Sequence, residues 1–158
     1  MVDYGVVGGE KYKIVLQDCT IGISISGPVK KYSVDYQVTL RVPVKTENYM
    51  SISGLRLESP VSSGTAPVYN LQAVKVSKSG INKAGYFEWK PVLNLAGDDT
   101  ANINLREEGN YSLVYYFNGN QSRRLPRRFK IEVSGMVGGV RETKTVWFKK
   151  RMLVQIFH

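Results

Sequence analysis

Alternation of apolar and polar residues with a period of two is the feature that most limits what this chain can fold into. From Tyr32 to Val44 the alternation runs almost without interruption. Successive side chains of a β-strand point to opposite faces, so the pattern predicts a strand with one face on a core and the other in water. Pro43 predicts an edge or a bulge near the end of this strand, because proline cannot donate to a sheet ladder.

Shorter runs with the same period follow one another along the chain. Changes of phase predict bulges near Gln17–Asp18 and at Ala73–Val74. One face is expected to carry Phe87, Trp89, Leu93 and Leu95 together. Turn residues separate the runs, and Asn118–Gly119 favours a hairpin. The further runs are 12–16, 19–25, 50–57, 69–76, 87–95, 103–105, 111–117, 129–133, 146–148 and 152–156.

No window of about 11 residues has the 3.6-residue period of an amphipathic helix. The sequence therefore predicts an all-β fold, an antiparallel β-sandwich of about nine or ten strands. With 158 residues and no linker-like stretch long enough to divide it, the chain is expected to form one domain over residues 1–158. The 42% hydrophobic residues exclude a disordered chain, and no apolar run approaches the roughly 20 residues of a membrane span.

The rare residues restrict catalytic chemistry. The single histidine, His158, is the last residue, and the single cysteine, Cys19, lies in an apolar run typical of a small core residue. A Ser-His-Asp site or a Cys/His zinc site within one chain is therefore not expected. Asp98–Asp99 and Glu107–Glu108 could share a calcium ion, but two acidic turns in water are the simpler interpretation. No nucleotide-binding or hydrolase motif is present, so we expect no enzyme and no cofactor; an enzyme built on two carboxylates is the third hypothesis.

The segment around Glu107-x-Gly109-x-Tyr111 has a recognisable pattern. It resembles the corner before strand F of immunoglobulin-like domains, with Glu107 where that family usually has Asp and Leu113 where it often has Cys. The resemblance implies that the tyrosine hydroxyl ties the corner to the upstream backbone. It also implies that Trp89 is the core tryptophan of strand C. An immunoglobulin-like sandwich is favoured over a jelly roll, and neither fold by itself reveals a function.

Positive charge is concentrated towards the end of the chain. The formal net charge is +9, and from Arg106 onward 11 bases stand against four acids. The densest basic run follows the predicted Asn-Gly hairpin, and a second cluster precedes the last run of alternating residues. Basic side chains beside aromatic ones can grip phosphates and stack on bases, and can equally contact an acidic protein. The candidate polyanion- or partner-binding residues are Arg123, Arg124, Arg127, Arg128, Lys130, Lys149, Lys150, Arg151 and Tyr116.

Two functions fit these observations better than an enzyme. The first is a binding or structural module that acts through protein contacts or self-association, a class that includes components of virions and other assemblies. Ten tyrosines and two tryptophans suit such a role, since these residues are enriched at interfaces. The alternative is binding of nucleic acid or another polyanion through a basic hairpin, 123–130. With no secretion signal at the start, an intracellular location or a place in a particle is expected.

Overall fold

The computed structural model describes residues 2–7, 13–17, 19–27, 36–45, 50–58, 69–97, 102–119 and 128–150. These residues form eleven strands and contain no α-helix, and therefore no helix able to cross a membrane. The all-β prediction is confirmed, with β1 as a strand that the alternation did not predict. The strands are β1 Val2–Val7, β2 Lys13–Leu16, β3 Cys19–Gly27, β4 Tyr36–Val44, β5 Met50–Glu58, β6 Tyr69–Ile81, β7 Phe87–Ala96, β8 Ile103–Leu105, β9 Gly109–Gly119, β10 Arg128–Val137 and β11 Val140–Lys150.

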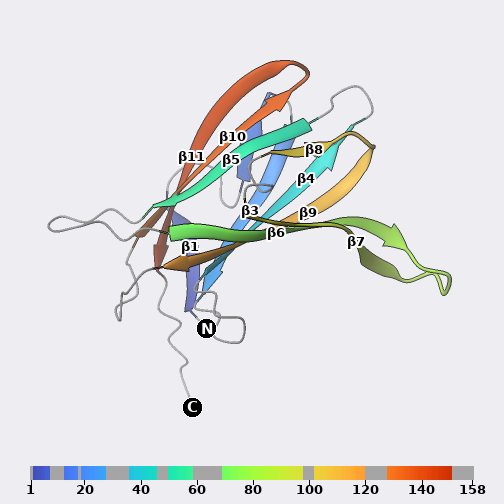
Figure 1. The fold of residues 1–158 in the computed structure, drawn as a ribbon, viewed down its shortest axis with the longest axis horizontal. Helices are drawn as coiled ribbons and strands as arrows, with labels where there is room; N and C mark the ends of the chain where they lie inside the picture. Colours follow the sequence, from blue (N-terminus) through green and yellow to red (C-terminus); the bar gives the residue numbers. More distant parts are fainter. Residues whose placement is uncertain are drawn as a thin grey trace, which may run out of the picture.

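The strands form two antiparallel sheets joined through β1 (Figure 1). Sheet A has the order β7-β6-β9-β4-β3, and β2 and the first residues of β1 pair with the far side of β3. Sheet B has the order β1-β11-β10-β5-β8. Because β1 pairs with β3 at Val2 and with β11 from Tyr4 onward, it leaves one sheet and enters the other.

The core consists of the inward-facing residues of both sheets. Strand β4 alternates between buried and partly exposed residues along its length, as predicted for 32–44, and residues 32–35 lie outside the described part. Pairing of β4 with β3 ends at Arg41, so Pro43 follows the last paired residue on that side, near the strand end. Cys19 is half-buried against the core and its thiol donates a hydrogen bond to the carbonyl oxygen of Pro43 at 3.2 Å.

The prediction of a bulge near Gln17–Asp18 is wrong. Leu16 pairs directly with Cys19, so the chain reverses there in a two-residue hairpin turn between β2 and β3. Gln17 takes a positive φ of 53°, and its backbone N–H and side-chain amide donate to the two carboxylate oxygens of Glu142 at 3.0 and 2.7 Å. A reversal changes the phase of the alternation in the same way as a bulge, and only the pairing distinguishes them.

The predicted Asn118–Gly119 hairpin is also wrong. Strand β9 pairs with β4 and β6 in sheet A, whereas β10 pairs with β5 and β11 in sheet B. Strands β9 and β10 therefore do not form a hairpin, and residues 120–127 between them lie outside the described part. The hairpin of this region is instead β10–β11, closed by Gly138 and Gly139 with φ values of 56° and 83°. Both values lie in the range that a two-residue hairpin turn requires and that glycine adopts without strain.

Bulges interrupt strand β6 and its pairing partners. Leu71 and Ala73 pair with consecutive residues of β9, which confirms the slip predicted just before Val74. A second bulge was not predicted: Val76 pairs with Leu93 and Ser77 with Pro91, which leaves Val92 as an extra residue in β7. An extra residue reverses which face the following side chains occupy. Phe87 and Trp89 therefore lie on the opposite face from Leu93 and Leu95, contrary to the prediction that all four share one face.

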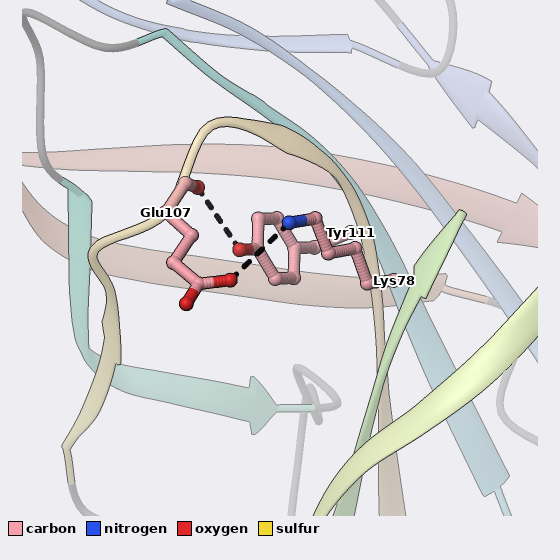
Figure 2. A network of polar contacts seen from close by, with 3 residues as sticks. All are labelled: Lys78, Glu107 and Tyr111. Carbon is pink, nitrogen blue, oxygen red and sulfur yellow. Dashed lines mark hydrogen bonds and ion pairs between the residues drawn. The ribbon is translucent and has the colours of Figure 1, made fainter. Parts of the chain in front are cut away.

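The turn before β9 has the hydrogen bond that the resemblance implied (Figure 2). The hydroxyl of Tyr111 donates to the backbone carbonyl oxygen of Glu107 at 2.9 Å. Gly109 has a φ of +152°, and an added Cβ would approach the Lys78 side chain to 2.6 Å, which accounts for glycine here. The Lys78 ammonium lies 3.3 Å from a Glu107 carboxylate oxygen and 5.7 Å from the centre of the Tyr111 ring.

Two tyrosines of β9 should respond in opposite ways to loss of the hydroxyl. Tyr111→Phe should lower the free energy of unfolding by about 1 kcal/mol, because it removes the hydrogen bond to Glu107. The Tyr115 hydroxyl is buried with no hydrogen-bond partner among the described residues, and burial raises the pKa of Tyr115. Tyr115→Phe should therefore raise the free energy of unfolding by about 1 kcal/mol. Urea unfolding of both variants measures the two changes in the free energy of unfolding. Equal losses of stability in the two variants would contradict the prediction.

Candidate interaction surfaces

The β6–β7 hairpin extends beyond the rest of the strands, and β7 is the edge of sheet A (Figure 1). Ser79–Gly80, which has the composition of a turn, lies within β6, and the chain reverses at 82–86 instead. There the Asn82 side-chain oxygen accepts hydrogen bonds from the backbone N–H groups of Ala84 and Tyr86, both at 3.0 Å. A side chain that satisfies two turn amides explains why this position ends the strand.

Exposed apolar side chains gather on this hairpin. Five of the eight exposed large hydrophobic residues of the described part belong to it, namely Ile81, Tyr86, Phe87, Val92 and Leu93. Ile81 and Phe87 are directly opposite each other, so they point to the same face, and they are 71% and 64% exposed. Phe87 also packs edge-to-face on Trp89, with ring centroids 5.5 Å apart. We call Ile81, Phe87 and Trp89 the hairpin patch.

The hairpin patch is continued towards the centre of sheet A by Arg41. The guanidinium carbon of Arg41 lies 4.4 Å from the centre of the Trp89 ring, a stacking distance for a cation on an aromatic face. Arg41 belongs to β4 and Trp89 to β7, and the strands between them carry the small residues Ser112 and Ser77 at this level of the sheet. The long side chains of Arg41 and Trp89 can therefore meet above these two serines. Ser112 is buried although it lies on the outer face. Trp89 is therefore not a core tryptophan, because none of the described strands packs on the outer face of sheet A.

The free edge of β7 is poorly suited to adding another strand. The backbone N–H of Asn82 donates to the carbonyl oxygen of Tyr86, so these two residues form a hydrogen-bonded pair. From this pair onward, hydrogen-bonded and non-hydrogen-bonded residue pairs alternate along β6 and β7, as in any antiparallel ladder. This alternation turns the backbone groups of Phe87, Trp89 and Pro91 towards the free edge. Pro91 has no N–H to offer, and proline at such a position blocks edge-to-edge pairing. Contacts of the hairpin patch are therefore expected through side chains.

The predicted basic residues are only partly within the described chain. Arg123, Arg124, Arg127, Arg151 and the side chain of Lys150 lie outside it. Arg128 is the first residue of β10 and pairs directly with Lys149 of β11. Their neighbours Phe129 and Phe148 are fully buried, so both cations point away from the core on the outer face of sheet B. The structure thus brings together one residue from each of the two basic clusters of the sequence.

Tyr116 does not join this group. It lies on the outer face of sheet A, between the buried Tyr115 and Phe117, and the ammonium of Lys75 is 5.5 Å from the centre of its ring. Because sheets A and B turn their inner faces to a common core, their outer faces look in opposite directions. Tyr116 and the pair Arg128–Lys149 therefore lie on opposite sides of the molecule.

Trp147 is a surface residue that the sequence analysis did not propose as a site residue. It is 40% exposed and pairs with Lys130, two residues before Lys149 on the same face. The alternation around the buried Phe148 already places Trp147 on the opposite, outer face, and this signal could have singled it out. We call Arg128, Lys130, Trp147 and Lys149 the basic face.

The cations of the basic face differ in their surroundings. The Lys130 ammonium lies 3.8 Å from a carboxylate oxygen of Glu58, which also pairs with Arg56 at 3.0 Å. Neither Arg128 nor Lys149 forms an ion pair with any acid whose side chain the structure describes. Over the same ranges no three His, Cys, Asp or Glu side chains come together as metal ligands, and Asp98–Asp99 lie outside them. The basic face therefore offers cations that can bind an anion and the Trp147 ring, on which a flat ring can stack.

Comparisons with known proteins identify no relative of this chain. No protein-family model, no curated protein and no solved structure matches the chain. Its class, an all-β fold of two antiparallel sheets, therefore rests on the strand pairing alone.

Proposed function

We propose that this protein is a non-enzymatic binding or structural module that acts through protein contacts, and that the hairpin patch is its contact surface. The observation that carries the proposal is the exposure of Ile81 and Phe87 next to Trp89 on a projecting hairpin. Large apolar side chains that gather on a surface mark interaction sites, whereas singly scattered ones do not. A component of a virion or of another assembly falls within this proposal.

The residue types of the patch support a contact role. Tryptophan and arginine are enriched among the residues that dominate binding energies. Trp89 is already held between Phe87 and the Arg41 guanidinium, so its ring loses little freedom when a partner covers it. An ordered aromatic side chain binds with a smaller entropic penalty than a mobile one.

The partner that we propose is a second copy of this chain. A two-fold contact places the same surface against itself, so the surface must be complementary to itself. The hairpin patch meets this condition because it is apolar and the guanidinium of the neighbouring Arg41 is engaged by Trp89. Stable interfaces bury about 800 Å² on each partner, and a patch of three side chains supplies only part of that area. Association should therefore be weak and depend on concentration.

For the fold we propose the immunoglobulin-like class of sandwich rather than a jelly roll. The support is the bond from the Tyr111 hydroxyl to the Glu107 carbonyl at the turn between β8 of sheet B and β9 of sheet A. That bond has the donor, the acceptor and the sheet-to-sheet position of the tyrosine corner.

Light scattering over a wide range of protein concentration tests the proposed contact. The unmodified protein should show a mean mass that rises from that of the 17.8 kDa monomer towards the dimer. Trp89→Ala combined with Phe87→Ser should return the mass to the monomer at every concentration, because both rings of the patch are removed.

The matched control is Trp147→Ala, which removes the exposed tryptophan of sheet B and leaves the hairpin patch intact. Its mass should equal that of the unmodified protein. A monomer at all concentrations, or equal loss of association in the control, would overturn the hairpin patch as a self-association surface.

A further inference from the structure

Two like charges lie directly opposite each other in sheet B. Arg128 and Lys149 are cross-strand partners, and side chains at such positions have Cβ atoms about 4.5–5.5 Å apart. Like charges at this separation destabilise a sheet. No acid whose side chain the structure describes forms an ion pair with either of them, so none of those acids compensates the repulsion. An anion bound between the two cations would remove it.

An exposed tryptophan adjoins this pair of charges. Trp147 and Lys149 are two residues apart on β11, which places them on one face about 7 Å apart along the strand. Lys130, directly across from Trp147, is partly neutralised by Glu58 at 3.8 Å. The basic face therefore combines one flat aromatic surface with two cations that no described acid neutralises, on adjacent positions of the paired strands β10 and β11.

We propose that the basic face binds single-stranded nucleic acid, with Arg128 and Lys149 on the phosphates and Trp147 stacked on a base. Proteins that bind single strands without sequence preference combine cations that follow the backbone with aromatic side chains on which bases stack. A double strand conceals its base faces, and a sulfated polysaccharide has no bases, so neither uses Trp147 in this way. The site is separate from the hairpin patch, which lies on the other sheet.

Fluorescence anisotropy with a labelled oligothymidylate tests this site at several salt concentrations. Trp147→Ala should weaken binding about 5- to 150-fold, the range measured for loss of one stacking aromatic ring. Each phosphate neutralised on a single strand contributes about −0.7 to the slope of log K against log salt. The double variant Arg128→Ala and Lys149→Ala should therefore make that slope shallower by about 1.4.

Trp89→Ala is the matched control, because it removes the other tryptophan of the chain from the opposite face. It should bind the oligonucleotide as the unmodified protein does. Circular dichroism of each variant checks that the sheets are retained, and all the altered side chains are at least partly exposed.

Three results would overturn the proposal. The first is the absence of oligonucleotide binding at low salt, and the second is equal weakening of binding by Trp147→Ala and Trp89→Ala. The third is a sulfated polysaccharide that binds the protein as tightly as the oligonucleotide does, with an affinity that neither Trp147→Ala nor Trp89→Ala changes. The last would identify a general polyanion surface. Failure here leaves the self-association test untouched, since that test reads the mass of the protein and depends on Trp89.

Discussion

Replacing Phe129 by alanine should lower the free energy of unfolding by about 3–5 kcal/mol, the largest effect we expect from a single substitution. Phe129 is fully buried in β10. Its ring packs edge-to-face on Tyr36 and Tyr69 of sheet A, with centroids 4.7 and 5.6 Å away, so it links the two sheets. The alanine variant would lose the buried apolar area and leave a cavity beside the rings of Tyr36 and Tyr69. Urea unfolding followed by circular dichroism measures the change.

The control is the same substitution at an exposed phenylalanine. Phe87 is 64% exposed on the hairpin, so Phe87→Ala should change the free energy of unfolding by about 0.5 kcal/mol or less. The two variants together separate the core of the sandwich from the hairpin patch. A loss at Phe87 as large as that at Phe129 would mean that the hairpin is part of the folding core and not a free contact surface.

Gly135→Ala should lower the free energy of unfolding by about 1–3 kcal/mol, as expected when extra volume is forced into a packed core. Gly135 is buried in β10 at the irregular pairing with β5. An added Cβ would lie 2.9 Å from the backbone oxygen of Ser51 and 3.1 Å from the Leu16 Cδ1 atom. The Ser51 oxygen belongs to the paired strand β5 and cannot move aside without disturbing that pairing.

Gly54 provides the matched control in the neighbouring strand. It pairs with Ser134 beside the same irregularity, but an added Cβ there would meet no atom within 4 Å. Gly54→Ala should leave the stability unchanged or raise it slightly, because alanine has fewer conformations to lose than glycine. Thermal unfolding of both variants compares them directly. Equal destabilisation would show that glycine is required by backbone conformation at this irregularity and not by the close approach of Ser51.

Most strands could be predicted because their signal is local. The alternation in 36–44 and 129–133 places the same residues inside as the structure does, since a pleated strand turns successive side chains to opposite faces. The turn at Glu107-x-Gly109-x-Tyr111 was equally accessible, because its hydrogen bond joins residues four apart in the chain.

The predictions that are wrong concern features that depend on pairing between distant segments of the chain. The local pattern at Gln17 is compatible with a bulge or a reversal, and only the pair Leu16–Cys19 decides for the reversal. Asn118–Gly119 has the chemistry of a hairpin turn, yet β9 and β10 find different partners in different sheets. The residues of a dipeptide determine which turn conformations it can adopt. Which strands become neighbours depends on how the strands pack around the hydrophobic core.

The sequence by itself determined that this chain is all-β, which face of most of its strands is buried and that its positive charge lies towards the end. These properties follow from the period of the side chains and from composition, which need no knowledge of neighbouring strands. Only the tertiary structure decided which side chains meet. The extra residue Val92 turns Phe87 and Trp89 outward, and the register of β10 with β11 sets Arg128 against Lys149. Both candidate surfaces depend on the register between strands, because a shift of one residue moves every side chain to the other face.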